Sequence, residues 1–397
     1  MKKVRVPVAE LKIGMYVVEL DRPWLGTPFA FQGFRITTPG QIEQIKNYSQ
    51  TVMVDPERDH VGDGSGTTGP VMVRGTTLYR ETVPVEKEMT QAAKIYSTCH
   101  TEIAEAIQRL RSGGGIDGKT LKASVSEMTE SVLRNPDALM LLAKLKTKGD
   151  YEFTRAVDTS VLMIAFGRFL QLSREELHLL GLAGMLLDVG KIEVSDAVLR
   201  KQGVLTPEEF EIAKRHVLYS AEIIGKEKDL SQNVSNVVME HHERQDGSGY
   251  PRGLRGAEIT LHGSIAGIVD SYSALVSLRP YAEQLSPSNA LSKLYKLRGK
   301  LFHEALVEQF IQCIGIYPVG SVVELNTGEI GVVIAQNLVR RLQPRVMVVL
   351  DKDWKPLRPQ KILDLLKEPR ATADQPYRIR RTMQADVLPV DLRDFFL

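Results

Sequence analysis

The pattern of hydrophobic and polar positions divides the chain into segments of three kinds. Residues 4–55 hold short runs of β-type residues, VRVPV, MYVVEL and TVMVDP, between Gly and Pro residues, which predicts a small β-rich module. The stretch DPERDHVGDGSGTTGP that follows has little to bury, so we expect a linker. Apolar residues then recur at helical spacing, at Ile95, Ile103, Ile107 and Leu110, until SGGGIDG ends that helix.

The middle of the chain, from about 117 to 314, has helical periodicity almost throughout. Capping residues separate the helices, among them Asn135 before Pro136, Ser173, and Thr206 before Pro207. The predicted helices span 119–134, 137–147, 152–171, 174–187, 207–215, 217–227, 231–242, 258–278, 287–299 and 303–314.

After Tyr317 the apolar residues alternate with period two, and Asn326-Thr327-Gly328 offers a hairpin turn. We expect a short C-terminal β element there, followed by a loosely held polar tail, KEPRATADQPYRIRRTMQ. The predicted fold class is mainly α, with a small N-terminal α/β or β domain. The expected domains are 1–60 (N-terminal module), 61–76 (linker), 77–150 (helical connector), 151–316 (main helical domain) and 317–397 (β extension and tail).

Composition narrows the class of protein. Lys and Arg number 51 against 49 Asp and Glu, so the formal charge of +2 does not favour nucleic-acid binding. Hydrophobic residues at 43% and charged residues at 25% are typical of a globular protein, which excludes disordered, collagen-like and disulfide-scaffold classes. Two distant cysteines, Cys99 and Cys313, indicate a reducing compartment, and no apolar stretch is long enough to span a bilayer. We therefore expect a cytoplasmic protein that does not bind membranes.

Candidate metal ligands lie in the main helical domain. Of eight histidines, His216 and the adjacent pair His241-His242 fall close together, before the Gly-rich run GSGYP. Adjacent residues sit about 100° apart on a helix, so both imidazoles can reach one pocket only near a helix end. Asp188 and Asp270 each follow an apolar helical segment, where a carboxylate is costly unless it is paired or binds a metal.

Imidazole and carboxylate together suit Mn, Fe, Ni or Zn, and two such ions can activate water against a phosphate. An isolated histidine is more often an ordinary core or surface residue. We interpret five others in that way: His60, His100, His178, His262 and His303.

The run HHERQDGSGYPRGL resembles the signature of HD-GYP domains, a branch of the HD metal-dependent phosphohydrolase superfamily whose active members hydrolyse cyclic di-GMP. The resemblance covers about 150–314, including LLDVGK and GIVDSYSALVSLRPYAEQL. The segment LKIGMYVVELDRPWLGTPFAFQGF resembles the domain of unknown function that often precedes HD-GYP domains, and 317–350 is similar to an extension that such proteins carry. The resemblance thus implies a helical phosphodiesterase fold.

Carried over position by position, the resemblance also implies departures from the active pattern. The entering ligand His falls on Arg155, and the His of the His-Asp pair falls on Leu187. Ser273 replaces a family Asp, and Ala282 replaces a basic residue. The positions that are kept imply metal ligands at Asp188, His216, His241, His242 and Asp270, phosphate contacts at Lys191 and Arg279, catalytic roles for Asp188 and Lys191, and a Tyr250 that lies over the pocket.

Arg155 and Leu187 both replace ligands of the same ion, so we expect one first-row ion or none per chain. Arginine offers no lone pair, but its guanidinium can pair with Asp188 or Asp270. The first hypothesis is a degenerate HD-GYP protein that senses cyclic di-GMP or acts as a scaffold. The second is an active phosphodiesterase with an altered metal site, and hydrolysis of another nucleotide or a structural role stays open. The resemblance implies GGDEF-domain partners at the GYP loop, and a homodimer through the helix at 90–111 stays open.

Overall fold

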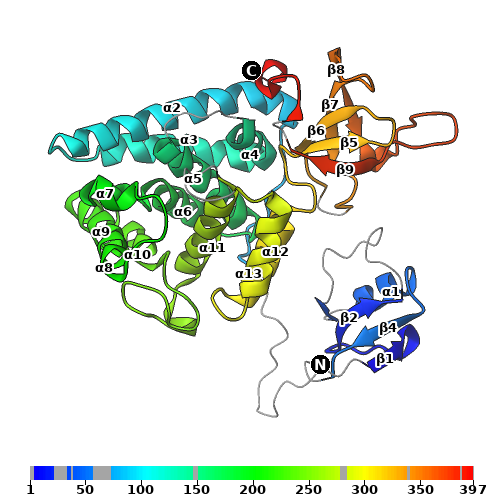
Figure 1. Ribbon diagram of the computed structural model, residues 1–397, viewed down its shortest axis with the longest axis horizontal. Coiled ribbons are helices and arrows are strands. Elements are labelled where there is room, and N and C mark those ends of the chain that lie inside the picture. Colours follow the sequence, from blue (N-terminus) through cyan, green and yellow to red (C-terminus); the bar gives the residue numbers. More distant parts are fainter. Residues whose placement is uncertain are drawn as a thin grey trace. The chain divides into compact units, whose positions relative to one another are not determined.

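The computed structural model describes residues 4–21, 34–36, 39–56, 73–145, 151–277, 284–337, 340–384 and 387–396 (Figure 1). The chain divides into two compact units. One comprises Met1–Met72 with Val339–Leu342, and the other comprises Val73–Leu338 with Gln343–Leu397. Most of the predicted linker, from residue 57 to residue 72, lies outside the described residues.

The first unit is the predicted β-rich module. Its four-stranded antiparallel sheet has the order β1-β4-β2-β3, where β1 is Val4–Pro7, β2 Tyr16–Leu20, β3 Phe34–Arg35 and β4 Thr51–Val54. The helix α1, Pro39–Lys46, contributes Ile45 to a core that also holds Val17 and Val52. The β-type runs of the sequence therefore form a small sheet with its own core.

The second unit is mainly helical, as predicted. Its helices are α2 Val85–Arg111, α3 Gly118–Arg134, α4 Pro136–Leu145, α5 Tyr151–Phe169, α6 Arg174–Leu186, α7 Asp196–Leu199, α8 Pro207–Lys214, α9 His216–Lys226, α10 Gln232–Glu240, α11 Leu261–Val276, α12 Pro287–Leu297 and α13 Glu304–Ile314, with a 3-10 turn, η2, at Val189–Glu193.

The predicted caps set several of these boundaries. Ser173 and Thr206 each form a capping box with the glutamate three residues later, and the Asn135 side chain accepts from the backbone N–H of Asp137 at 3.0 Å. Thr260 caps α11 by accepting from the Gly263 N–H, so this helix begins three residues later than we predicted. The short α7 was not predicted, because four residues carry no recognisable helical period.

Helices α5, α6, α10 and α11 pack on one another and carry most of the site described below (Figure 1). Aromatic contacts join α13 to this group of helices. The centroid of the Phe310 ring on α13 lies 5.1 Å from that of Phe166 on α5 and 5.2 Å from that of Tyr272 on α11. The apolar stripe of α2 is buried at Ile95, Ile103 and Ile107, and α2 packs on α3, α4 and α5 within the chain. The stripe is thus used in packing this unit.

The C-terminal segment is a five-stranded antiparallel sheet of order β8-β7-β6-β5-β9. A turn at Asn326-Thr327-Gly328 joins β5 to β6 as predicted, with φ +85° at the glycine. The strands are β5 Val322–Leu325, β6 Ile330–Ala335, β7 Arg345–Leu350, β8 Pro356–Asp364 and β9 Ile379–Met383.

The predicted loosely held tail is wrong for Ile379–Met383, because this segment pairs with β5 along its length. Glu324 on β5 is only 7% exposed, and its carboxylate accepts from Arg380 at 2.9 Å and from Arg381 at 2.6 Å. The two arginines interrupt the hydrophobic pattern that would predict a strand. In the sheet they compensate the buried charge of Glu324.

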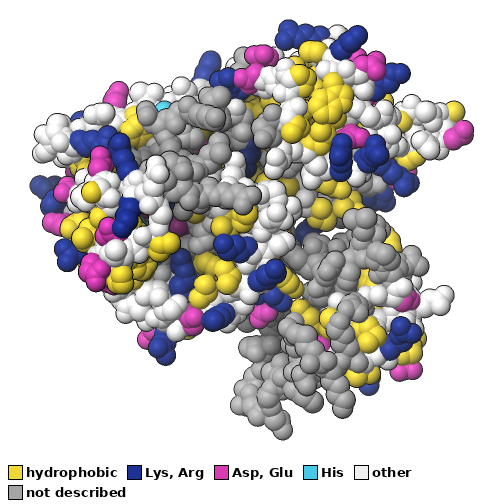
Figure 2. Space-filling view, in the orientation of Figure 1, with side chains coloured by type: hydrophobic (Ala, Val, Ile, Leu, Met, Phe, Trp, Pro, Cys, Tyr) yellow, Lys and Arg dark blue, Asp and Glu magenta, His cyan; other side chains and the backbone are white. Residues whose placement is uncertain are grey.

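Surface charge agrees with the near-neutral composition. Figure 2 shows Lys and Arg side chains interspersed with Asp and Glu over the visible face, with no single basic field. Within the described parts of the chain, none of the helices is both long and apolar enough for a bilayer crossing. Cys99 is buried, whereas Cys313 is half-buried.

Candidate metal and nucleotide site

Three histidines come together at the ends of two helices. His216 begins α9, and its Nδ1–H donates to the carbonyl of Ala213 at 2.8 Å. His241 follows the last residue of α10, and its Nδ1–H donates to the carbonyl of Val238 at 2.5 Å. The chain turns there, so His242 reaches the same point, and the ligand atoms of the three rings lie within 4.8 Å of one another. The adjacent pair thus lies at a helix end with its ligand atoms close to that of His216.

The tautomers of two of these rings follow from the hydrogen bonds. Because a carbonyl only accepts, the proton of each neutral ring lies on Nδ1, and Nε2 of His216 and of His241 carries a lone pair. Both Nε2 atoms are buried and make no hydrogen bond within the part of the chain that the structure describes. Burial lowers the pKa of His241 to about 4, and it lowers the pKa values of His216 and His242 as well. At neutral pH the cluster therefore presents neutral imidazoles, the form that binds metals.

The GYP loop is held tightly against the end of α10. A Cβ on Gly249 would lie 2.4 Å from the backbone nitrogen of Arg244 and 2.5 Å from the carbonyl oxygen of His242, so only glycine fits. The Glu243 carboxylate accepts from the backbone N–H groups of Arg252 at 2.7 Å and of Leu254 at 2.9 Å. The Tyr250 ring stacks on the His242 ring with centroids 4.7 Å apart. The predicted position of Tyr250 over the pocket is consistent with this stacking.

Two aspartates face the cluster. Asp188 follows α6, and its Oδ1 lies 3.4 Å from His216 Nε2 while its Oδ2 lies 2.8 Å from the Lys191 ammonium. Asp270 lies on α11 with a side chain only 7% exposed. Burial alone would raise the pKa of Asp188, but Lys191 and Arg155 beside it hold that pKa well below its usual range. Asp188 is therefore ionised.

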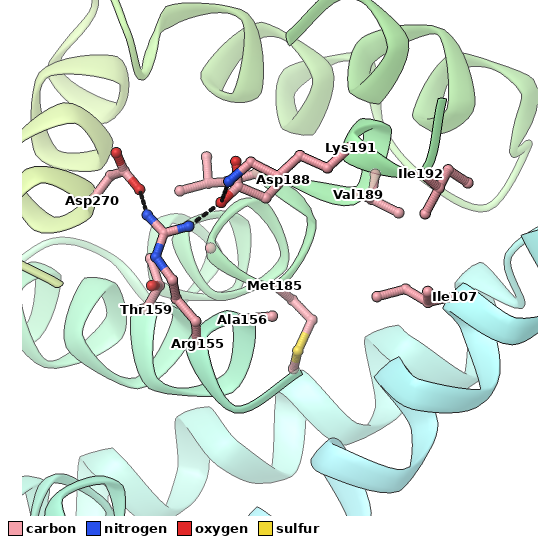
Figure 3. Close-up of a pocket in the computed structure, with 12 residues that line it drawn as sticks. Ile107, Arg155, Ala156, Thr159, Met185, Asp188, Val189, Lys191, Ile192 and Asp270 are labelled. Carbon is pink, nitrogen blue, oxygen red and sulfur yellow. Dashed lines mark hydrogen bonds and ion pairs between the residues drawn. The ribbon is translucent and has the colours of Figure 1, made fainter. Parts of the chain in front are cut away.

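Arg155 joins the two carboxylates. Its side chain extends from α5 and is 11% exposed, and its Nη1 and Nη2 groups donate to Asp188 Oδ2 and to Asp270 Oδ1 (Figure 3). Leu187, at the position of the His in the family's pair, is 2% exposed. We expected Arg155 to pair with one or the other aspartate, and it pairs with both.

Beside this ion pair lies a cavity of about 50 Å³ (Figure 3). The charged groups of Arg155, Asp188 and Asp270 lie at one end of it, and Ile107 from α2 lies at the other. Most of its remaining wall is apolar, with Thr159 and Lys191 as the polar exceptions. This space is large enough for ordered water.

The three histidines are a group that could hold a metal ion. Three neutral imidazoles with the Asp188 oxygen that faces His216 are a suitable donor set for a first-row ion. The other pair of oxygens, on Asp188 and Asp270, already accepts from a guanidinium that stays protonated and cannot ligate. The expected limit of one ion or none per chain stays a prediction.

The structure describes only some of the remaining predicted site residues. Ser273 lies on α11 near Asp270 and is 3% exposed, and its hydroxyl has no hydrogen-bond partner among the described residues. Arg279 and Ala282 lie outside the described residues. Sequence reasoning missed Phe210 and Lys214, whose spacing of four on α8 places them on one helix face beside Tyr250.

The helical bundle and its cluster of histidines and aspartates define the class of protein, an HD-type domain. Comparison with known families agrees: residues 138–306 match the HD domain family, residues 3–121 a domain of unknown function (DUF3391), and residues 322–378 a KOW domain associated with HD domains.

Similar proteins narrow the class further. The chain is 33% identical over 369 residues to the cyclic di-GMP phosphodiesterase PA4108 of Pseudomonas aeruginosa, covering 91% of this chain and 88% of that protein. It is 35% identical over 193 residues to the cyclic di-GMP phosphodiesterase response regulator RpfG of Xanthomonas campestris pv. campestris, covering 48% of this chain and 50% of that protein.

Among solved structures, the HD-GYP-type protein Bd1817 of Bdellovibrio bacteriovorus matches at 15% identity with a TM-score of 0.47, covering 78% of this chain and 98% of that one. On the sequence relatives, the chain belongs to the HD-GYP family of HD-domain proteins, a family of cyclic di-GMP signalling.

Proposed function

We propose that this protein is a degenerate HD-GYP protein that binds cyclic di-GMP or a related cyclic dinucleotide and hydrolyses it weakly or not at all. It would act as a nucleotide sensor or as an interaction scaffold. The single observation that carries the proposal is the guanidinium of Arg155 between Asp188 and Asp270. A fixed organic cation holds the two carboxylates that an ion would otherwise need.

The consequence for catalysis follows from charge and coordination. In two-ion sites a pair of metals stabilises both the attacking and the leaving oxygen of a phosphoryl transfer. Here His216, His241, His242 and Asp188 would hold one ion, which when bound supplies Lewis-acid polarisation of a phosphate oxygen. Arg155 is unable to lower the pKa of a water by coordination, so generation of the nucleophile is expected to be weak.

Binding of the nucleotide is supported by groups that remain. Lys191 is 34% exposed while it contacts Asp188, so its ammonium has room to approach a phosphate. We propose Lys191 and Arg279 as phosphate contacts and Tyr250 as part of the nucleotide wall. GGDEF-domain partners at the GYP loop and a homodimer remain proposals that rest on the family resemblance.

A direct test compares binding with turnover. Elemental mass spectrometry of protein purified without chelator should give one ion or none per chain, and calorimetry with cyclic di-GMP should detect binding while chromatography detects little product. The double variant Arg155→His with Leu187→His should gain a second ion and raise turnover, with Arg174→His as a control on the surface of α6. Two ions per unsubstituted chain, or turnover typical of an active phosphodiesterase, would contradict the proposal.

A second candidate is an active phosphodiesterase with an altered, single-ion site. The observation that favours it is the intact cluster of neutral imidazoles, whose ligand atoms lie within 4.8 Å of one another. Under this candidate, turnover should depend strictly on an added divalent ion, and His241→Ala should abolish it. The same chromatographic assay therefore separates the two functions.

A further inference from the structure

The ring of Tyr250 lies between His242 and a pair of residues on α8. It stacks on His242 with centroids 4.7 Å apart and planes at 29°, and it meets the ring of Phe210 edge to face at 6.1 Å. The Lys214 ammonium lies 5.3 Å from the Phe210 centroid and 5.6 Å from the Tyr250 centroid. An aromatic and cationic column thus leads from the surface of α8 to one of the three clustered histidines.

Core packing does not explain this column. None of the residues of α8 is buried, and Phe210 keeps 47% of its surface exposed. Lys214 is 24% exposed, and its ammonium is also paired with Glu211 at 2.5 Å, which restrains it beside the two rings. The helix therefore presents an exposed aromatic ring and a restrained cation to Tyr250.

The three imidazoles differ in what orients them. His216 and His241 are each fixed by a bond from Nδ1 to a backbone carbonyl. For His242, no ring hydrogen bond is found among the residues that the structure describes. Its ring is instead enclosed by aromatic contacts, with Tyr250 on one side and with His241 at 4.0 Å and His216 at 5.1 Å between centroids. Metal-binding histidines need an outer partner that fixes the ring, and for His242 that partner is a stacked ring.

We propose that Tyr250 is a positioning residue for His242, and that Phe210 and Lys214 fix Tyr250 from α8. The tyrosine of the GYP motif thereby replaces the carbonyl that orients the other two histidines. The inference rests on the metal-binding part of the proposed function and is independent of hydrolysis. It assigns to the exposed helix α8 a direct influence on metal affinity.

Titration of the full chain with Co²⁺ tests the inference, because the visible spectrum of bound Co²⁺ reports ligand geometry without any turnover. Tyr250→Ala should raise the Co²⁺ dissociation constant about tenfold or more and change the spectrum, as loss of outer-shell partners does in other sites. Phe210→Ala acts only through Tyr250 and should raise the dissociation constant by less. Tyr250→Phe should bind like the unsubstituted protein, because the ring and not the hydroxyl makes the stack.

The control is Val204→Ala, because Val204 is 92% exposed just before α8 and contributes little to packing. Thermal unfolding in chelator separates positioning from a structural role: Phe210→Ala should melt like Val204→Ala while it binds Co²⁺ more weakly. Unchanged Co²⁺ affinity in both Tyr250→Ala and Phe210→Ala would overturn the inference, as would the absence of Co²⁺ binding by the unsubstituted chain. Cyclic di-GMP binding is measured separately, so its failure would remove the proposed function and leave this comparison valid.

Discussion

Replacing Arg155 with alanine is expected to destabilise the helical unit, because it removes the cation shared by two carboxylates. The Arg155 and Asp270 side chains are 11% and 7% exposed, so both charges are mostly withdrawn from water. Asp188 keeps Lys191 as a partner at 2.8 Å, and Asp270 therefore bears most of the loss. Removing one partner of a buried pair costs about 3–5 kcal/mol, and with one carboxylate still compensated we expect the lower part of this range, about 3 kcal/mol.

The assay is urea denaturation in the presence of a chelator, which prevents a stray ion from replacing the lost cation. Arg174→Ala is the matched control, since Arg174 is 57% exposed and pairs with Glu130 at 3.1 Å on the surface. That exposed pair should contribute less than about 1 kcal/mol. Asp270→Asn combined with Arg155→Ala should recover part of the lost stability, because no unpaired charge then remains at that position.

A divalent ion provides an independent check on the same reasoning. Without Arg155, the carboxylates of Asp188 and Asp270 are available to an ion, so added Mn²⁺ should stabilise Arg155→Ala more than it stabilises the unsubstituted chain. A loss in chelator no larger than that of Arg174→Ala would refute the view that the guanidinium compensates the two charges. Equal stabilisation of both proteins by Mn²⁺ would refute it as well.

Two further predictions concern stability away from Arg155. Burial, together with the charge of Glu81, raises the pKa of Asp137 to about 7, so between pH 4 and pH 7 the folded state binds more protons than the unfolded state, and stability falls as the pH rises. From pH 5 to pH 8 the unsubstituted chain should lose about 3 kcal/mol relative to Asp137→Asn in urea denaturation, and parallel pH profiles would contradict this. Gly249→Ala should lower the midpoint of thermal unfolding by several degrees through backbone overlap, whereas Gly225→Ala in α9, where no atom lies within 4 Å of the added Cβ, should leave it equal or higher. A lower midpoint for the α9 variant than for Gly249→Ala would contradict that explanation.

Local patterns in the sequence were sufficient to predict most of the helices in the second unit. Caps at Asn135, Ser173 and Thr206 are short-range features, so their effect on helix boundaries can be predicted without the fold. The convergence of His241 and His242 could also be predicted, because an adjacent pair followed by a Gly-rich run has only one way to share a pocket.

Contacts between residues far apart in the chain could not be predicted from the sequence. The strand Ile379–Met383 depends on a partner some 55 residues earlier, and its arginines compensate a glutamate that only the sheet buries. The residue type at Arg155 excluded an ion ligand, but its simultaneous contact with Asp188 and Asp270 requires α5, α6 and α11 to meet. The contact of Phe210 with Tyr250 likewise joins two surface segments that show no shared pattern.

Under the proposed function, the two oxygens of Asp188 would have separate roles. Oδ2 is bound by Arg155 and Lys191, whereas Oδ1 faces His216 at 3.4 Å. Without Arg155, a site that held only one ion would leave uncompensated carboxylate charge beside that ion. A guanidinium supplies the compensating charge permanently and independently of metal supply, and it holds Asp188 in the orientation that the histidines need. Under the proposed function, a guanidinium that can neither change its coordination nor activate water would preserve the binding geometry and would remove half of the catalytic apparatus.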